Sequence, residues 1–133
     1  MENAPIIVKG WPLVEVVFQG EADQQQVEQW LLQMDALLEK EQPFGLLTKT
    51  TEESAFSDLA RKAMGLWFKQ QRELIGRWCV GVSRIAINEA AVERLAGPKM
   101  QAAMPCPIFA AVADAEARQW LENQFSVFES NSR

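Results

Sequence analysis

The chain has 133 residues, of which 48% are hydrophobic and 23% are charged, and its formal net charge is −5. This length fits one domain with an ordinary hydrophobic core. No apolar run reaches the roughly 18–20 residues that a membrane-spanning helix requires, and the first residues lack the basic and apolar segments of a signal peptide. Histidine is absent, which excludes serine–histidine and cysteine–histidine catalysis and most catalytic zinc sites. We therefore expect a cytoplasmic, non-enzymatic protein with no metal, cofactor or membrane partner.

The charge balance also argues against a nucleic-acid partner. Lysine and arginine total 13 against 18 acidic residues, whereas a duplex-binding domain carries a basic stripe for phosphate contacts. The basic residues are scattered, apart from a group along one predicted helix that we interpret as a solvated face. This group comprises Arg61, Lys62, Lys69, Arg72 and Arg77.

Cys79 and Cys106 each stand at the start of an apolar run. A buried free thiol that packs as a small hydrophobic group is the ordinary state of such a cysteine. The alternative is a disulfide between them if the two runs form neighbouring strands, which a cytosolic setting disfavours.

The first half of the chain predicts a hairpin, a helix and a strand. The β-branched runs 5–9 and 13–18, joined by Gly10-Trp11-Pro12, indicate two antiparallel strands. Apolar residues then recur at three- and four-residue spacing, which is typical of an amphipathic helix of about 18 residues. They are Val27, Trp30, Leu31, Met34, Leu37 and Leu38. Residues 44–47 predict a short buried strand, and residues 48–54 form a polar segment.

The second half predicts two further strand–helix units. Thr50 and Glu53 fit a capping box for a long helix that Gly76 ends. Residues 78–87 indicate a central strand, with Val80, Val82 and Ala86 expected on one face. Asn88 caps a helix over 89–96, which Gly97-Pro98 breaks. Residues 108–113 predict an edge strand, and Asp114 caps a last helix.

This element order, β-β-α-β-α-β-α-β-α, predicts one α/β domain over residues 1–129, followed by a frayed tail at 130–133. Alternating strands and helices indicate a mostly parallel sheet with right-handed crossovers. We expect five strands, with the antiparallel hairpin at one edge.

Several segments of the chain resemble the anti-sigma-factor antagonist-like (STAS) fold, and more closely a small bacterial family of uncharacterised proteins with that fold. They are the hairpin at 6–20, the strand entry at 41–47, the basic helix ending at 72–74, the strand at 81–86, and the closing segment from 114 to 121. The resemblance implies a partner-binding or ligand-sensing domain. In the antagonists a serine at the start of the second long helix is phosphorylated, and the phosphate ejects the partner. Here the Asp-Ser-Ser-Gly-like motif is replaced by residues 54–58, so the candidate phosphorylation sites are Ser54 and Ser57.

The polar segment 48–54 is the strongest site candidate that the residues themselves indicate. It joins the end of a predicted strand to the start of a predicted helix, where free N–H groups and the helix dipole favour anions. Ligands of open α/β sheets bind at this end of the strands. The candidate anion- or ligand-binding residues are Thr48, Lys49, Thr50, Ser54 and Arg84, with Lys49 and Arg84 expected to flank one pocket. The alternative is an ordinary capped surface loop.

The aromatic residues suggest a second surface. Leu66, Trp67 and Phe68 are consecutive on the second long helix, so its circumference is more apolar than one buried face requires. The candidate interaction surface comprises Met64, Trp67 and Phe68, with Phe125 and Phe128 of the tail as a cover. The first hypothesis for function is an interaction or regulatory module, as a homodimer or as a binder of another protein. The second is a carrier or sensor of a small apolar or anionic ligand, with a pocket between helices and sheet.

Overall fold

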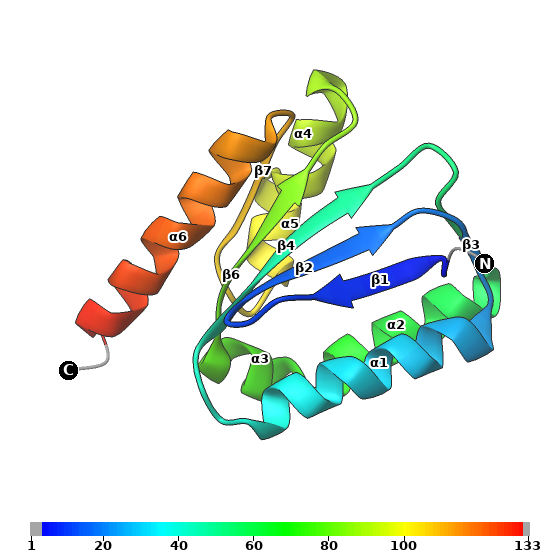
Figure 1. The fold of residues 1–133 in the computed structure, drawn as a ribbon, viewed down its shortest axis with the longest axis horizontal. Coiled ribbons are helices and arrows are strands. Elements are labelled where there is room, and N and C mark those ends of the chain that lie inside the picture. Colours follow the sequence, from blue (N-terminus) through cyan, green and yellow to red (C-terminus); the bar gives the residue numbers. More distant parts are fainter. Residues whose placement is uncertain (1–3, 132–133) are drawn as a thin grey trace.

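A computed structural model of the protein describes residues 4–131 and has a five-stranded central sheet (Figure 1). Its strands are β1 (Ile6–Lys9), β2 (Leu13–Phe18), β4 (Phe44–Thr50), β6 (Cys79–Ile85) and β7 (Ile108–Ala111), in the order β1-β2-β4-β6-β7. β1 is antiparallel to β2, and every other neighbouring pair is parallel. The predicted mostly parallel sheet with an antiparallel edge hairpin is therefore confirmed.

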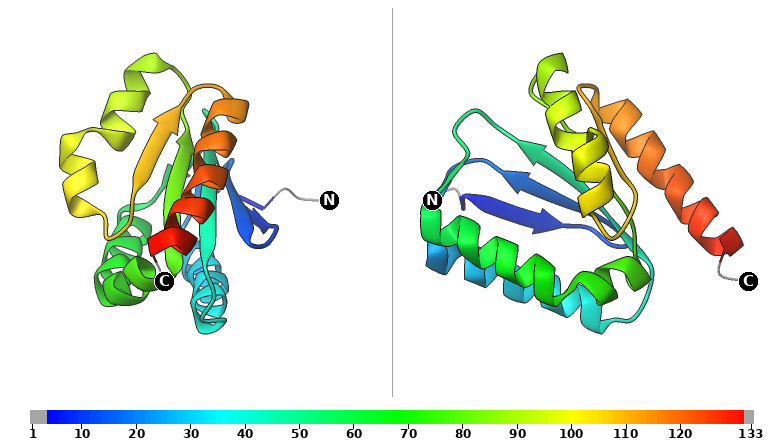
Figure 2. Two further views of the ribbon diagram at one scale, coloured as in Figure 1. Left: turned by 90° about the vertical axis from the view of Figure 1, so that its left-hand side faces the viewer. Right: turned by 180° about the vertical axis from the view of Figure 1, so that it is seen from behind.

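Six helices are present in the described residues. They are α1 (Gln24–Glu39), α2 (Asp58–Gln70), α3 (Arg72–Trp78), α4 (Glu89–Ala96), α5 (Pro98–Ala103) and α6 (Asp114–Asn131). Because β2, β4, β6 and β7 follow one another across the sheet in a single direction, right-handed crossovers place all the connecting helices on the same face. Only α6, which follows the last strand, covers the opposite face (Figure 2).

Two hydrophobic clusters fill the spaces on the two faces of the sheet. Val14, Val16 and Leu46 belong to the larger cluster, which includes the inner sides of α1 and α2. The smaller cluster consists of Leu47, Val80, Ala117 and Leu121 beneath α6, with partly buried neighbours that include Trp120. Successive side chains of a strand point to opposite faces of the sheet, so the central strands contribute residues to both clusters. This is expected for a sheet covered on both sides.

A register shift in β6 changes one prediction about these faces. Phe44 pairs with Cys79, but Gly45 pairs with Gly81, so Val80 is an extra residue opposite the junction. Such a bulge inverts the alternation locally. Val80 therefore packs under α6 while Val82 belongs to the opposite cluster, and the expectation that the two share a face is wrong.

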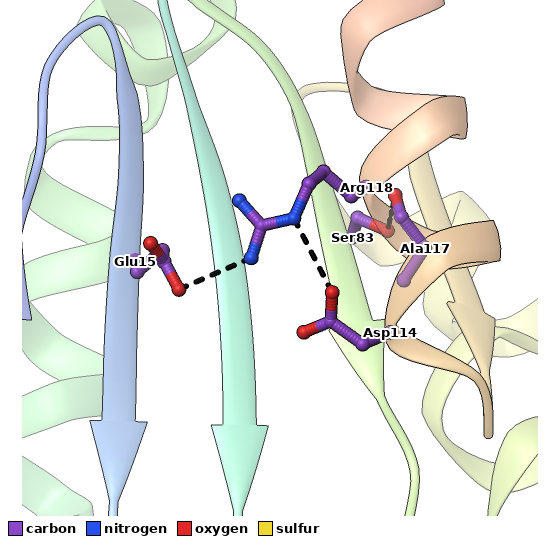
Figure 3. A network of polar contacts seen from close by, with 5 residues as sticks. All are labelled: Glu15, Ser83, Asp114, Ala117 and Arg118. Carbon is purple, nitrogen blue, oxygen red and sulfur yellow. Dashed lines mark hydrogen bonds and ion pairs between the residues drawn. The ribbon is translucent and has the colours of Figure 1, made fainter.

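The helix α6 is held close to the sheet by small residues and by hydrogen bonds. A Cβ at Gly45 would lie 2.7 Å from Leu121 Cδ1. The fully buried Ser83 donates its hydroxyl proton to the Ala117 carbonyl at 2.7 Å. Figure 3 shows this contact beside Arg118, which forms ion pairs with Asp114 and Glu15, each at 3.3 Å.

The segment between β4 and β6 differs from the prediction in three respects. Thr50 belongs to β4, and the cap of α2 is Ser57, whose Oγ accepts a hydrogen bond from the Ala60 N–H at 3.1 Å. The expected Thr50–Glu53 capping box is therefore wrong. Before α2 begins, β5 (Ala55–Phe56) pairs with β3 (Glu21–Ala22) in a separate two-stranded sheet. The expected long helix is interrupted at Gln71, and Gly76 lies inside α3 rather than ending the helix.

The remaining elements follow the prediction with small changes. Asn88 caps α4, as expected, by accepting a hydrogen bond from the Ala91 N–H. Asp114 is the first residue of α6, which runs on through Asn131, so residues 130 and 131 are helical rather than frayed. Residues 132–133 of the expected tail lie outside the described residues. Cys79 and Cys106 are both buried free thiols, as predicted.

Candidate functional site: a methionine-rich cavity with one arginine

A cavity of about 350 Å³ lies between the sheet and the helices α1, α2, α4 and α5. Such a volume falls at the lower end of the range of ordinary small-molecule sites. All but three of the lining residues are apolar. The lining comprises Val16, Phe18, Trp30, Met34, Leu46, Thr48, Thr50, Phe56, Met64, Phe68, Val82, Arg84, Ile85, Leu95, Met100 and Met104.

Methionines contribute an unusual share of this lining. Four of the five methionines in the chain line the cavity, namely Met34, Met64, Met100 and Met104. A thioether side chain is unbranched, flexible and polarisable, so methionine surfaces adapt to ligands of differing shape. Met64, Met100 and Met104 are only half-buried, and the cavity wall that they form is therefore accessible from solvent.

An aromatic group forms the wall near β2 and β5. The Phe18 ring meets the Trp30 ring edge-to-face at 5.3 Å and the Phe56 ring at 5.6 Å. Edge-to-face pairs fix ring orientation beyond what simple burial does. The two edge-to-face contacts therefore orient the Phe18 ring in this wall.

The polar part of the cavity comes from the carboxyl-terminal halves of two neighbouring strands. Thr48 of β4 pairs in register with Arg84 of β6, and Thr50 follows on the same face of β4. Leu46 and Val82, two residues earlier on the same strands, are buried and apolar. The cavity therefore has an apolar floor and one polar end.

Arg84 is half-buried at this end, and no acidic side chain among the described residues forms an ion pair with it. Its Nη1 donates a hydrogen bond to the Leu95 carbonyl at the end of α4, at 3.1 Å. None of the ion pairs found in residues 4–131 includes Arg84. Burial lowers the pKa of Arg84 from its ordinary value, yet a guanidinium stays protonated at neutral pH. The site thus presents a cation with unused N–H donors to a largely apolar cavity.

Only part of the predicted anion site is assembled. Thr48, Thr50 and Arg84 come together, as expected. Lys49 alternates to the other side of β4 and is exposed, so it does not flank the cavity with Arg84. Ser54 lies in the turn after β4, where its N–H donates to the Thr51 carbonyl, and it does not line the cavity. The loop prediction failed because β4 continues through Thr50, beyond the apolar run.

The predicted interaction surface is divided between separate parts of the molecule. Met64 and Phe68 line the cavity, and Trp67 is buried with its indole N–H donating to Asp35 Oδ1 at 2.7 Å. They therefore do not form one exposed strip. Phe125 and Phe128 pack with α6 against the smaller cluster on the opposite face of the sheet. They do not cover α2.

The two candidate phosphorylation sites also differ from each other. Ser57 is exposed and caps α2, and Ser54 is half-buried in the preceding turn. Phosphorylation of either serine stays a prediction.

The residues of α4 and α5 that close the cavity are not among the predicted site residues. Leu95, Met100 and Met104 lie on both sides of the break at Gly97-Pro98, which we predicted only as an interruption of a helix. The signal in the sequence was that large apolar residues continue beyond the break, at Met100 and Met104. The second short helix, α5, places these residues against the cavity.

Comparisons with protein-family models, with curated proteins and with solved structures found no match for this chain. The resemblance to the STAS family therefore stays a prediction. Within residues 4–131, no helix combines the length and apolar character needed to cross a membrane. The same residues contain no cluster of three or more cysteine, aspartate and glutamate side chains placed to hold a metal ion.

Proposed function

We propose that the protein is a carrier or sensor of a small amphiphile, a molecule with an apolar body and one anionic group. The ligand occupies the cavity lined by the four methionines, with its anionic group at Arg84. The observation that carries this proposal is a half-buried guanidinium without an acidic partner among the described residues, facing an otherwise apolar cavity.

The chemistry of Arg84 favours a carboxylate or a similar planar anion. A guanidinium donates two parallel hydrogen bonds to such a group, and the interaction strengthens where water is scarce. The Thr48 hydroxyl, in register with Arg84, adds a further donor. The Leu95 carbonyl orients the guanidinium from the other side.

The remaining lining side chains support binding rather than catalysis. They are thioether, aliphatic, aromatic and hydroxyl groups, and none of these acts as a general base at neutral pH. The cavity volume of about 350 Å³ suits a medium-chain carboxylic acid better than a bulky lipid.

A STAS-like assignment belongs to the same proposal. It is supported by the order of strands and helices, which is the order on which the resemblance rests. A ligand-sensing domain of this kind transmits occupancy of its cavity to a protein partner. The cavity lies between the sheet and α2, whose first residues follow the candidate serines.

Native mass spectrometry with added decanoate tests the binding proposal. We expect one decanoate per chain, lost in a denatured spectrum of the same sample, and weaker binding of uncharged decanol. Met64→Trp should block binding because Met64 lines the cavity, whereas Leu66→Trp on the outer side of α2 should not. Absence of a decanoate adduct, or equal binding by the two variants, contradicts the proposal.

A further inference from the structure

A separate apolar surface lies on the outer side of α1 and α2. Leu32 of α1 and Leu59 and Leu66 of α2 are 67%, 57% and 56% exposed. All three line a groove of about 580 Å³ that runs between the two helices. Single exposed leucines are common on protein surfaces, but three around one groove form a contiguous apolar patch of the kind that marks an interaction site.

The two sides of this groove carry opposite charges. Glu28 and Asp35 line it from α1, which contains no lysine or arginine. Lys62 lines it from α2, which also carries Arg61 and Lys69. Asp35 is engaged by the Trp67 indole N–H. Glu28 and Lys62 are both exposed, and they form no ion pair with each other within the chain.

The relative direction of the helices makes this charge pattern self-complementary. α1 and α2 both return from the end of one parallel strand to the start of the next, so they run in the same direction side by side (Figure 2). The contact between Trp67 and Asp35 aligns the two helices. Glu28 precedes Asp35 by seven residues and Lys62 precedes Trp67 by five, so the two charges lie within about one helical turn of each other along the groove. Rotation by 180° about an axis parallel to the helices leaves every residue at its own level along the groove. It places the acidic α1 of one copy opposite the basic α2 of the other.

We infer that a second copy of this chain docks on this groove, with α1 of each copy lying over α2 of the other. Leu32 then packs between Leu59 and Leu66 of the second copy, and Glu28 faces its Lys62. This is an isologous interface, in which each such contact occurs twice. The self-complementary order of leucines and charges favours a second copy over a partner of different sequence.

The small size of the face indicates a weak, reversible association. Helices of this length and width give a face of about 20 Å by 20 Å. This is smaller than the interface of a permanent dimer, so we expect a dissociation constant in the micromolar range.

Charge reversal on either side of the groove tests the proposed interface by sedimentation equilibrium. In Glu28→Lys, two lysines face each other at both contacts, and in Lys62→Glu two glutamates do. Each variant alone should dimerise at least about tenfold more weakly than the wild type. An equal mixture of the two should associate again, because both contacts in the mixed dimer then join a lysine to a glutamate. Val127→Glu, at an exposed position of α6 on the other side of the sheet, is the matched control and should leave the dimer unchanged.

Three outcomes would overturn the inference. They are a wild type that stays monomeric at several hundred micromolar, single variants that dimerise like the wild type, and a mixture that fails to restore association. Thermal unfolding of each variant confirms that these exposed substitutions leave the fold intact. Decanoate binding is independent of this interface, so the two proposals fail separately.

Discussion

Thr48 and Arg84 occupy paired positions on two neighbouring parallel strands, and both side chains line the same cavity. On the same strands, the buried residues Leu46 and Val82 form the apolar floor. Strand alternation thus places a threonine and an arginine at one end of a cavity that is otherwise lined by methionine and aromatic groups. This arrangement matches the two parts of an amphiphile.

The charge of Arg84 can be tested against that of Lys49, a cation on the opposite side of the sheet. Arg84→Gln should weaken decanoate binding by about 10- to 100-fold, because a hydrogen bond to a charged group contributes about 1.5–3 kcal/mol. Lys49→Gln should leave the affinity unchanged, since Lys49 is exposed and does not line the cavity. Isothermal titration calorimetry measures both. An equal loss in the two variants would show that only the overall charge matters.

Two glycines in different surroundings should respond in opposite ways to an added methyl group. Gly45 lies beneath α6, whereas Gly65 lies on the open side of α2. Gly45→Ala should lower the free energy of unfolding by about 1–3 kcal/mol, because the new Cβ meets Leu121 at 2.7 Å. Gly65→Ala should raise it by about 0.5–1 kcal/mol, because Gly65 lies within α2 and a Cβ there meets nothing within 4 Å. Urea denaturation gives both values. A neutral Gly45→Ala would mean that α6 packs less tightly.

The polar contacts of α6 should differ in their response to salt. Ser83→Ala removes a buried hydrogen bond to the Ala117 carbonyl and should lower the free energy of unfolding by about 1 kcal/mol at any ionic strength. Arg118→Ala removes ion pairs to Asp114 and Glu15 at the surface (Figure 3) and should lower it by at most about 1 kcal/mol. High salt should reduce only the Arg118 effect. A salt-sensitive Ser83 effect would contradict this assignment.

The two buried cysteines should react in a fixed order. A hydrogen bond with Cys106 and burial raise the pKa of the Cys79 thiol well above its ordinary value. The same hydrogen bond lowers the pKa of Cys106. The thiolate is the reactive form, so iodoacetamide should label Cys106 first under native conditions, and both should label readily in urea. Peptide mapping by mass spectrometry follows the order, and earlier labelling of Cys79 would contradict it.

Hydrophobic periodicity was sufficient to predict the five strands of the central sheet, their sequence along the chain and most of the helices. Alternation over 13–18 and the three- and four-residue spacing that begins at Val27 reflect burial on one face, which is a property of each segment by itself. The direction of the crossovers then follows from chirality. Thr48, Thr50 and Arg84 could be predicted as neighbours because polar residues at the carboxyl ends of adjacent parallel strands meet at one edge of the sheet.

Features that depend on contacts between distant segments could not be predicted in this way. β4 continues through the polar residues 48–50 because β2 and β6 pair with them on both sides. The bulge at Val80 depends on the register of β6 against β4. The start of α2 is delayed because Ala55 and Phe56 pair with β3. Each of these contacts placed a residue on a face or in an element other than the predicted one.

Methionine methyl NMR tests the central claim most directly. In protein labelled with ¹³C at the methionine and leucine methyl groups, each of Met34, Met64, Met100 and Met104 reports on the cavity that it lines. We predict that decanoate shifts these four signals together in a saturable titration, and that Arg84→Gln moves the same titration to higher concentration. The methyl groups of Leu32 and Leu66 on the outer groove should stay unchanged. Unchanged methionine signals, or shifts confined to the outer leucines, would contradict the proposed cavity site.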